Sequence, residues 1–398
     1  MKILLVSGHV RNWNAGASTV YLHLDEELRA LGHECRLLHA EDYLPARLSD
    51  LAYKTAASVW VRRTVLPLAP GMDVVEVAGN IGWQLFQSLR ALPNSARPLL
   101  VTRLHGLEFK DEQARVDEEI ARQATLPRKY KLLTRHWTNW QEYRTLSLAD
   151  TVICHSTREA DALVVGRLKP ETQVRTLPLG VDARFFGSPR TLAPPAGFLS
   201  DAPCRMLWWG TWIERKGISV LPRAFALACR EQPTLTLTLG GTGRTPEQIL
   251  PLFAPEVRAR VQVLPFVTPP EHVSVLQNHD LFVFPSLSEG FGLALLEAMA
   301  AELACITTFT GLAHDWLEHG QNAFLVPMSA PTALARAMVR LSGEPALRLM
   351  LGANARKTAR QLTWAHCAKE TIHAYAGGRQ TLRPAPAASL LADNITHA

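Results

Sequence analysis

Two glutamates, Glu289 and Glu297, lie eight positions apart in the stretch FVFPSLSEGFGLALLEAMA. The run LFVF, which Pro285 ends, predicts a buried parallel strand, and the run LALLEAMAAEL consists mainly of good helix formers. The turn between them contains Gly290 and Gly292, so backbone N–H groups at the helix start can approach a ligand closely. Helical side chains lean toward the helix N-terminus, which returns Glu297 to the pocket that Glu289 faces. Two acceptors beside one anion site indicate a sugar attached to a diphosphate.

The pattern of the elements that position this turn predicts a doubly wound α/β protein. Short apolar runs alternate with helical patterns along two series of strands, so each series predicts a parallel sheet. The first series belongs to an expected N-terminal domain, 1–186, and the second to a C-terminal domain, 204–364. The proline-rich stretch 187–203 is the expected linker. We expect a last helix over about 365–376 and a disordered tail over 377–398.

Composition excludes several classes of protein. The 398 residues suit two domains, and the net charge of +6 is dispersed, which argues against nucleic acid as a partner and allows anionic small molecules or an acidic membrane surface. Six cysteines without a Cys-x-x-Cys pair indicate a reduced, cytosolic protein with no structural zinc. The start, MKILLVSGHV, predicts a first strand rather than a signal peptide. No apolar run approaches the roughly 20 residues of a membrane span, so we expect any membrane association to be peripheral.

Further motifs follow one another along nearly the whole chain. They are HGLE at 105–108, LADTVICHS at 148–156, LPLGVDARFF at 177–186, WWGTWIERKGI at 208–218 and NAFLVP at 322–327. With the Glu-x7-Glu stretch, their order resembles retaining glycosyltransferase family 4. The resemblance implies the GT-B fold, in which two doubly wound Rossmann-like domains face each other across a cleft. The competing interpretation of the two glutamates is purely structural, as a helix cap and a partner of the helix dipole.

The resemblance assigns the diphosphate of a nucleotide-sugar donor to the segment around Lys216. Breaking the bond to the sugar puts negative charge on the leaving phosphates, and cations stabilise it. Many family members carry an arginine where Thr211 stands here, so either Arg215 replaces that cation or the site has one cation fewer. Without the resemblance, an Arg-Lys pair predicts a solvated surface.

His105 ends a predicted strand and is followed by Gly106, so its ring should project into the cleft. The resemblance implies that it contacts the transferred sugar and helps to stabilise an oxocarbenium-like transition state, with front-face attack and no enzymic nucleophile. The catalytic set is therefore His105, Lys216 and Glu289. The donor-binding set is Gly16, Arg215, Lys216, Gly241, Phe266, Val267, Glu289, Gly290, Phe291, Gly292, Leu293 and Glu297.

No set of metal-ligating residues stands out in the sequence, so we expect neither a metal nor a cofactor. The segment 126–150 combines Arg128, Lys129 and Lys131 with Trp137 and Trp140, which suits either an anionic membrane surface or a solvated helix. The sequence thus predicts a retaining glycosyltransferase with a glycan or lipid-linked acceptor, in bacterial surface polysaccharide or lipopolysaccharide synthesis. Two rivals are a GT-B sugar-nucleotide epimerase and a non-catalytic nucleotide-sugar-binding protein.

Overall fold

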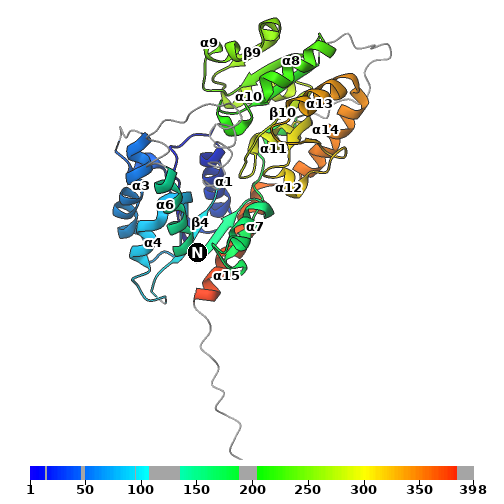
Figure 1. Ribbon diagram of the computed structural model, residues 1–398. Coiled ribbons are helices and arrows are strands. Elements are labelled where there is room, and N and C mark those ends of the chain that lie inside the picture. Colours follow the sequence, from blue (N-terminus) through cyan, green and yellow to red (C-terminus); the bar gives the residue numbers. More distant parts are fainter. Residues whose placement is uncertain (14–15, 46–49, 95, 107–134, 188–203, 383–398) are drawn as a thin grey trace, which may run out of the picture.

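The computed structural model describes residues 1–13, 16–45, 50–94, 96–106, 135–187 and 204–382. Within these ranges the chain forms two lobes, each built on a six-stranded sheet whose strands all run parallel (Figure 1). The first sheet has the order β2-β1-β3-β4-β5-β6, and its strands are β1 (Lys2–Val6), β2 (Glu34–Leu38), β3 (Val74–Ala78), β4 (Leu99–Arg103), β5 (Thr151–Cys154) and β6 (Val174–Thr176).

The second sheet has the order β12-β11-β10-β7-β8-β9. Its strands are β7 (Arg205–Trp209), β8 (Thr236–Gly240), β9 (Val261–Leu264), β10 (Leu281–Phe284), β11 (Ala304–Thr308) and β12 (Phe324–Val326). The last strand, β12, is only three residues long, and two of its residues are partly buried. The α/β architecture with two doubly wound sheets is confirmed.

Helices cover both faces of each sheet, which explains why the strands are apolar on both sides. In β1, Leu4 and Val6 pack with α3 and α4, whereas Ile3 and Leu5 pack with α1 and α15. The helices of the first lobe are α1 (Gly16–Ala30), α2 (Ala40–Tyr43), α3 (Asp50–Val65), α4 (Trp83–Leu89), α6 (Arg135–Leu148) and α7 (Thr157–Val165). Those that follow in the chain are α8 (Leu221–Glu231), α9 (Pro246–Ile249), α10 (Pro269–Gln277), α11 (Leu293–Ala300), α12 (Ala313–Trp316), α13 (Pro331–Gly343), α14 (Pro345–Ala359) and α15 (Trp364–Leu382).

The last helix, α15, returns from the second lobe and lies against α1, β4 and β5 of the first (Figure 1). It continues to Leu382, so the prediction of a disordered tail from residue 377 was wrong for residues 377–382. The packing of this helix requires a glycine at position 378. A Cβ on Gly378 would lie 2.6 Å from Thr151 Oγ1, so only glycine lets the helix approach the sheet this closely. Residues 383–398 lie outside the described part of the chain.

A buried ionic network fastens α15 to the first sheet. Arg103 on β4 donates from Nε to Glu76 Oε1 on β3 at 2.7 Å, and both side chains are fully buried. Tyr375 donates its hydroxyl to Glu76 Oε2 at 2.7 Å, and Arg103 Nη2 donates to Thr371 Oγ1 at 3.1 Å. Removal of one partner would leave a buried charge without full compensation, which is costly.

The two lobes also touch directly. The buried cluster of the second lobe includes Val20 of α1, and Thr157 at the start of α7 donates its N–H to Asp315 Oδ2 at 2.9 Å. Arg158 donates to the carbonyl of Phe309 at 2.9 Å.

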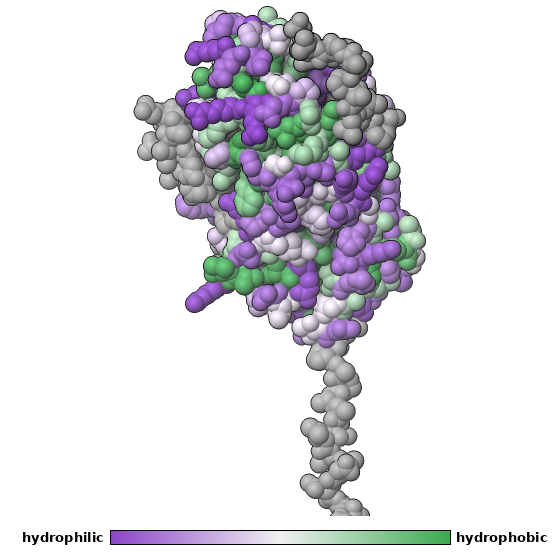
Figure 2. All heavy atoms as spheres, turned by 90° about the vertical axis from the view of Figure 1, so that its right-hand side faces the viewer, coloured by the Kyte–Doolittle hydropathy of each residue, from purple (hydrophilic) through white to green (hydrophobic). Residues whose placement is uncertain are grey.

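Of the expected linker, only Gly187 lies within the described residues. The face in Figure 2 intersperses hydrophilic and hydrophobic residues. No helix in the described ranges is long and apolar enough to cross a membrane.

Candidate functional site

A cavity of about 800 Å³ separates the carboxyl edges of the two sheets. Ligands of open α/β sheets bind at this edge because loops from neighbouring strands converge there. Every residue that the sequence assigned to the site lies on the cavity wall. These residues are Gly16, His105, Arg215, Lys216, Gly241, Phe266, Val267, Glu289, Gly290, Phe291, Gly292, Leu293 and Glu297. The structure brings them together from both lobes, and their individual roles stay predictions.

The glycine turn after β10 requires glycine at two positions, for two different reasons. Gly292 is the residue before α11 and has a φ of 97°, a left-handed conformation that favours glycine. A Cβ on Gly290 would lie 2.5 Å from the carbonyl carbon of His105 and 2.6 Å from the nitrogen of Gly106. The turn of the second lobe therefore rests directly on the backbone that follows β4 in the first.

Glu289 is held by both cations of the neighbouring turn. Lys216 donates from Nζ to Glu289 Oε1 at 2.7 Å, and Arg215 Nη1 lies 3.3 Å from Glu289 Oε2. Burial by itself would raise the pKa of Glu289, but the charges of Lys216 and Arg215 outweigh it and hold the pKa below its ordinary value. The carboxylate is thus ionised, and Arg215 reaches the cavity, where Thr211 also lies.

The two cations lie in a short turn and not at a helix N-terminus. Residues Glu214–Lys216 form a single 3-10 turn that ends at Gly217, and α8 begins only at Leu221. Gly217 has a φ of 71°, and a Cβ there would lie 2.1 Å from the carbonyl oxygen of Pro285. The turn is held against the end of β10 by this contact, which explains how it presents Lys216 to Glu289.

Glu297 lies in α11 at the other side of the cavity and differs from Glu289 in its environment. Burial raises the pKa of Glu297 to about 8, and the charge of Arg184 offsets only part of this effect. Its Oε2 lies 3.7 Å from His272 Nε2, and the His272 ring stacks on Trp209 with 3.7 Å between centroids. Burial lowers the pKa of His272 to about 3, so its ring is neutral at neutral pH, whereas burial favours the protonated form of Glu297.

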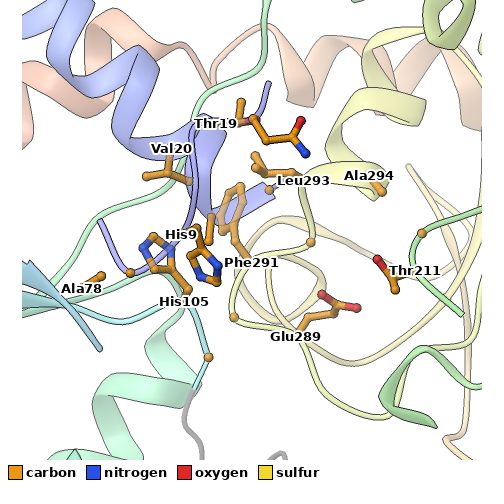
Figure 3. A pocket seen from close by; sticks show the side chains of 18 of the residues that line it. His9, Thr19, Val20, Ala78, His105, Thr211, Glu289, Phe291, Leu293 and Ala294 are labelled. Carbon is orange, nitrogen blue, oxygen red and sulfur yellow. The ribbon is translucent and has the colours of Figure 1, made fainter. Parts of the chain in front are cut away.

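Histidines line the first-lobe wall. Figure 3 shows His9 and His105 beside Phe291, with Glu289 and Thr211 across the cavity. His105 packs edge-on against Tyr21 at 5.5 Å and lies 5.9 Å from the ring of His155. Burial, with a smaller contribution from His155, lowers the pKa of His105 well below its ordinary range. The ring is therefore neutral, and its buried Nε2 has no hydrogen-bond partner among the described residues.

The remaining predicted residues contribute mainly backbone. Gly241 has a φ of 67° and follows β8, whereas Phe266 exposes 86% of its surface in the loop after β9. Gly16 is the first residue of α1. The helix begins early because Ser18 and Thr19 bond the preceding loop: Asn12 donates its N–H to Ser18 Oγ at 2.9 Å, and Thr19 donates to the carbonyl of Trp13 at 2.9 Å.

Sequence reasoning missed several residues of the cavity wall. Arg184 belongs to the quoted stretch LPLGVDARFF, and His155 belongs to LADTVICHS, so both lay inside recognised motifs without an assigned role. Trp209 and His272 come from β7 and α10, and no spacing relates them in the sequence. Three residues of α6 also line the cavity: Thr138, Gln141 and Glu142.

The proposed membrane segment falls largely outside the described residues, which include none of Arg128, Lys129 and Lys131. The part that is described forms α6, where Trp137 and Trp140 stack with 4.9 Å between centroids. Trp83 of α4 meets Trp140 edge-on at 4.9 Å. The two tryptophans of the segment therefore pack in an aromatic cluster, although Trp140 still exposes 41% of its surface.

Comparisons with known families cover both lobes. The family described as Glycosyltransferase Family 4 matches residues 14–185, and the family described as Glycosyl transferases group 1 matches residues 203–344. A D-inositol 3-phosphate glycosyltransferase of Pseudarthrobacter chlorophenolicus is 31% identical over 240 residues, which are 59% of this chain and 57% of that protein. The chain thus spans about half the length of this curated relative.

Solved structures resemble the whole chain at low sequence identity. Sucrose-phosphate synthase from Thermosynechococcus elongatus aligns with a TM-score of 0.73 at 20% identity and covers 94% of this chain and 98% of its own. WaaG, a glycosyltransferase involved in lipopolysaccharide biosynthesis, aligns with a TM-score of 0.68 at 15% identity and covers 96% and 100%. Anabaena HepE in complex with UDP-glucose aligns with a TM-score of 0.64 at 16% identity and covers 94% and 99%. Two matching family descriptions, one for each lobe, and a shared two-lobe fold show that the chain belongs to the group 1, family 4 glycosyltransferases with the GT-B fold.

Proposed function

We propose that the chain transfers a sugar, with retention of anomeric configuration, from a nucleotide diphosphate sugar to a glycan or lipid-linked acceptor. The observation that carries this proposal is the placement of Lys216 and Arg215 within hydrogen-bond reach of Glu289 on one cavity wall. The two cations would bind the diphosphate, and Glu289 would accept hydrogen bonds from the hydroxyls of the sugar. Glu297, in α11, would bind the ribose. The complex of Anabaena HepE with UDP-glucose supports a donor of this chemical class.

The leaving group gains negative charge as the bond to the sugar breaks, and preorganised charges stabilise that state most. Lys216 and Arg215 supply two positive charges, and the residues at the start of α11, where backbone N–H groups favour anions, line the same cavity. Neutral His105 would lie beside the sugar, whose ring becomes positively charged in the transition state. A second positive charge would be unfavourable there, which is consistent with the lowered pKa of His105.

The pairing of Glu289 supports the proposal of retention by front-face attack. A carboxylate bound to two cations is a weak nucleophile, because its lone pairs are engaged and its charge is compensated. The acceptor hydroxyl would instead lose its proton to a phosphate oxygen of the donor. The reaction needs no metal in this scheme, and the described residues contain no group of three or more side chains that could hold a metal ion.

The acceptor would enter along α6, whose Gln141 and Glu142 lie on the cavity wall. We propose surface polysaccharide or lipopolysaccharide synthesis as its setting, in line with the involvement of the structurally similar WaaG in lipopolysaccharide biosynthesis.

The enzyme would work in the cytosol and dock peripherally on anionic lipid through the segment 126–150. Replacement of Arg128, Lys129 and Lys131 by serine should weaken binding to anionic vesicles by about 1 kcal/mol per charge. Vesicle sedimentation that is unchanged in this variant would contradict docking.

The decisive experiment is a donor screen with the full chain. Purified protein is incubated with UDP-glucose, UDP-N-acetylglucosamine and GDP-mannose, and release of nucleotide and of free sugar is followed by chromatography and NMR. Initial formation of the α-anomer from an α-linked donor supports retention, whereas the β-anomer contradicts it. Release of an epimer with the C2 configuration changed would favour the rival epimerase function. Binding without any turnover, with or without acceptor extracts, would favour the non-catalytic binding function.

A further inference from the structure

His155 occupies the first-lobe wall of the cavity, two residues before α7, and the proposed mechanism does not use it. It directly follows β5, so it lies at the carboxyl edge of the sheet beside His105 of the neighbouring strand. Its backbone N–H donates to Glu159 Oε2 at 3.2 Å, and the next residue, Ser156, caps α7. The position of the ring is therefore fixed by the backbone on both sides.

The hydrogen bond of one ring nitrogen determines the chemistry of the other. His155 Nδ1 lies 2.8 Å from the carbonyl oxygen of Leu177. A carbonyl oxygen can only accept, so Nδ1 carries the proton. Burial lowers the pKa of His155 to about 3, which keeps the ring neutral. In the neutral ring Nε2 must then be a lone-pair acceptor.

That acceptor is buried and has no hydrogen-bond partner among the described residues. His155 is 1% exposed and lines the cavity, as do its ring neighbours His105 and Phe291. The Phe291 ring meets it edge-on with 6.3 Å between centroids. A buried acceptor costs free energy unless a ligand supplies a donor, and sites of this kind strongly reject ligands that lack the matching group.

We propose that His155 selects the donor sugar by accepting a hydrogen bond at Nε2 from one hydroxyl of the hexose held beside His105. This inference rests on the proposed function, because it requires a sugar in the cavity. The chemical class follows from the tautomer. A hydroxyl can donate to Nε2, whereas a carboxylate, a carbonyl oxygen or a fluorine at the same place cannot. The sugar position that faces His155 therefore carries a hydroxyl and is not oxidised to a carboxylate.

The test uses two variants, each of which can replace the hydrogen bond of only one ring nitrogen. In His155→Asn the side-chain amide reaches the place of Nδ1 and can still donate to Leu177, but no atom remains at the place of Nε2. In His155→Gln the amide reaches the place of Nε2, where its oxygen can accept. His373→Asn is the matched control, because this histidine of α15 exposes 74% of its side chain and lies far from the cavity.

The substrates are the nucleotide-sugar that the wild type hydrolyses fastest and its deoxyfluoro analogues at each ring hydroxyl. We expect one analogue to lose about tenfold in kcat/KM with the wild type, and we expect this loss to vanish in His155→Asn and to return in part in His155→Gln. UDP affinity should stay within twofold in all variants, because free UDP lacks the sugar. The same ranking of analogues in His155→Asn and in the wild type would overturn the inference while leaving the proposed function intact.

A measurement on the unmodified protein covers the case in which a variant does not fold. Imidazole 15N spectra should show the Nε2 resonance of His155 moving upfield when the nucleotide-sugar is added and staying in place when UDP is added. An Nε2 chemical shift that does not change on addition of the nucleotide-sugar, although turnover proceeds, would overturn the role of His155. A wild type that hydrolyses none of the nucleotide-sugars and shows no spectral change would overturn the proposed function and the inference together.

Discussion

Gly290→Ala should separate nucleotide binding from turnover. The φ of Gly290 lies outside the left-handed region, so alanine fits the backbone and only the neighbouring atoms oppose it. A Cβ would lie 2.5 Å from the carbonyl carbon of His105, whereas ordinary contacts are 3.4–4 Å, so the two lobes must separate by roughly 1 Å. Overpacking of this kind costs about 1–3 kcal/mol, and here the cost falls on the closed arrangement of the lobes.

The expected result is a loss of about fivefold to 150-fold in kcat/KM for donor hydrolysis, because each 1.4 kcal/mol is a factor of ten. UDP affinity, measured by calorimetry, should change by less than about threefold, since Lys216, Arg215 and Glu297 all belong to the second lobe. Small-angle scattering should report a larger radius of gyration. Gly343→Ala is the control, because a Cβ there meets only Gln232 Nε2 at 3.8 Å. Wild-type turnover in a folded Gly290→Ala protein would refute the inference that the lobes must close through this contact.

Three further predictions follow from buried charges. Lys216→Met should lower turnover about 100-fold and weaken UDP binding less, because Lys216 would act mainly on the charge that the leaving group gains; full activity in hydrolysis assays would mean that this turn does not hold the diphosphate. Glu297 has a pKa of about 8 in the empty site, and ribose hydroxyls that donate to it should lower that pKa. UDP binding should therefore release a proton, and UDP affinity should rise as the pH increases from 6 to 8. Calorimetry in buffers of different ionisation enthalpy measures this release, which should disappear in Glu297→Gln, and equal release in both proteins would contradict the assignment. Tyr375→Phe removes one hydrogen bond to the buried Glu76 and should cost about 1.5–3 kcal/mol, seen as a lower thermal midpoint of unfolding; an unchanged midpoint would show that this hydrogen bond does not stabilise the contact of α15 with the sheet.

Local patterns in the chain were sufficient for the fold and for the turn at the centre of the site. Strands such as β10 are short apolar runs ended by Pro285, and this signal depends only on neighbouring residues. Glu289 and Glu297 were found because one lies in the turn and the other in the helix that follows directly. The end of the last helix was misjudged because local sequence does not show what a helix packs against, and Gly378 is required by the close approach of α15 to Thr151.

The sequence by itself determined which residue types are available at each strand end, and it indicated a diphosphate and sugar site. Only the tertiary structure decided which of these residues meet. Lys216 and Glu289 are far apart in the chain, so their 2.7 Å contact depends on β7 and β10 lying side by side. The pKa values also depend on the tertiary structure. Glu289 is ionised because two cations face it, whereas the pKa of Glu297 is raised to about 8 because the effect of burial dominates. Two glutamates of one motif thus acquire different charges, because desolvation and Coulomb interactions depend on distances that local sequence does not encode.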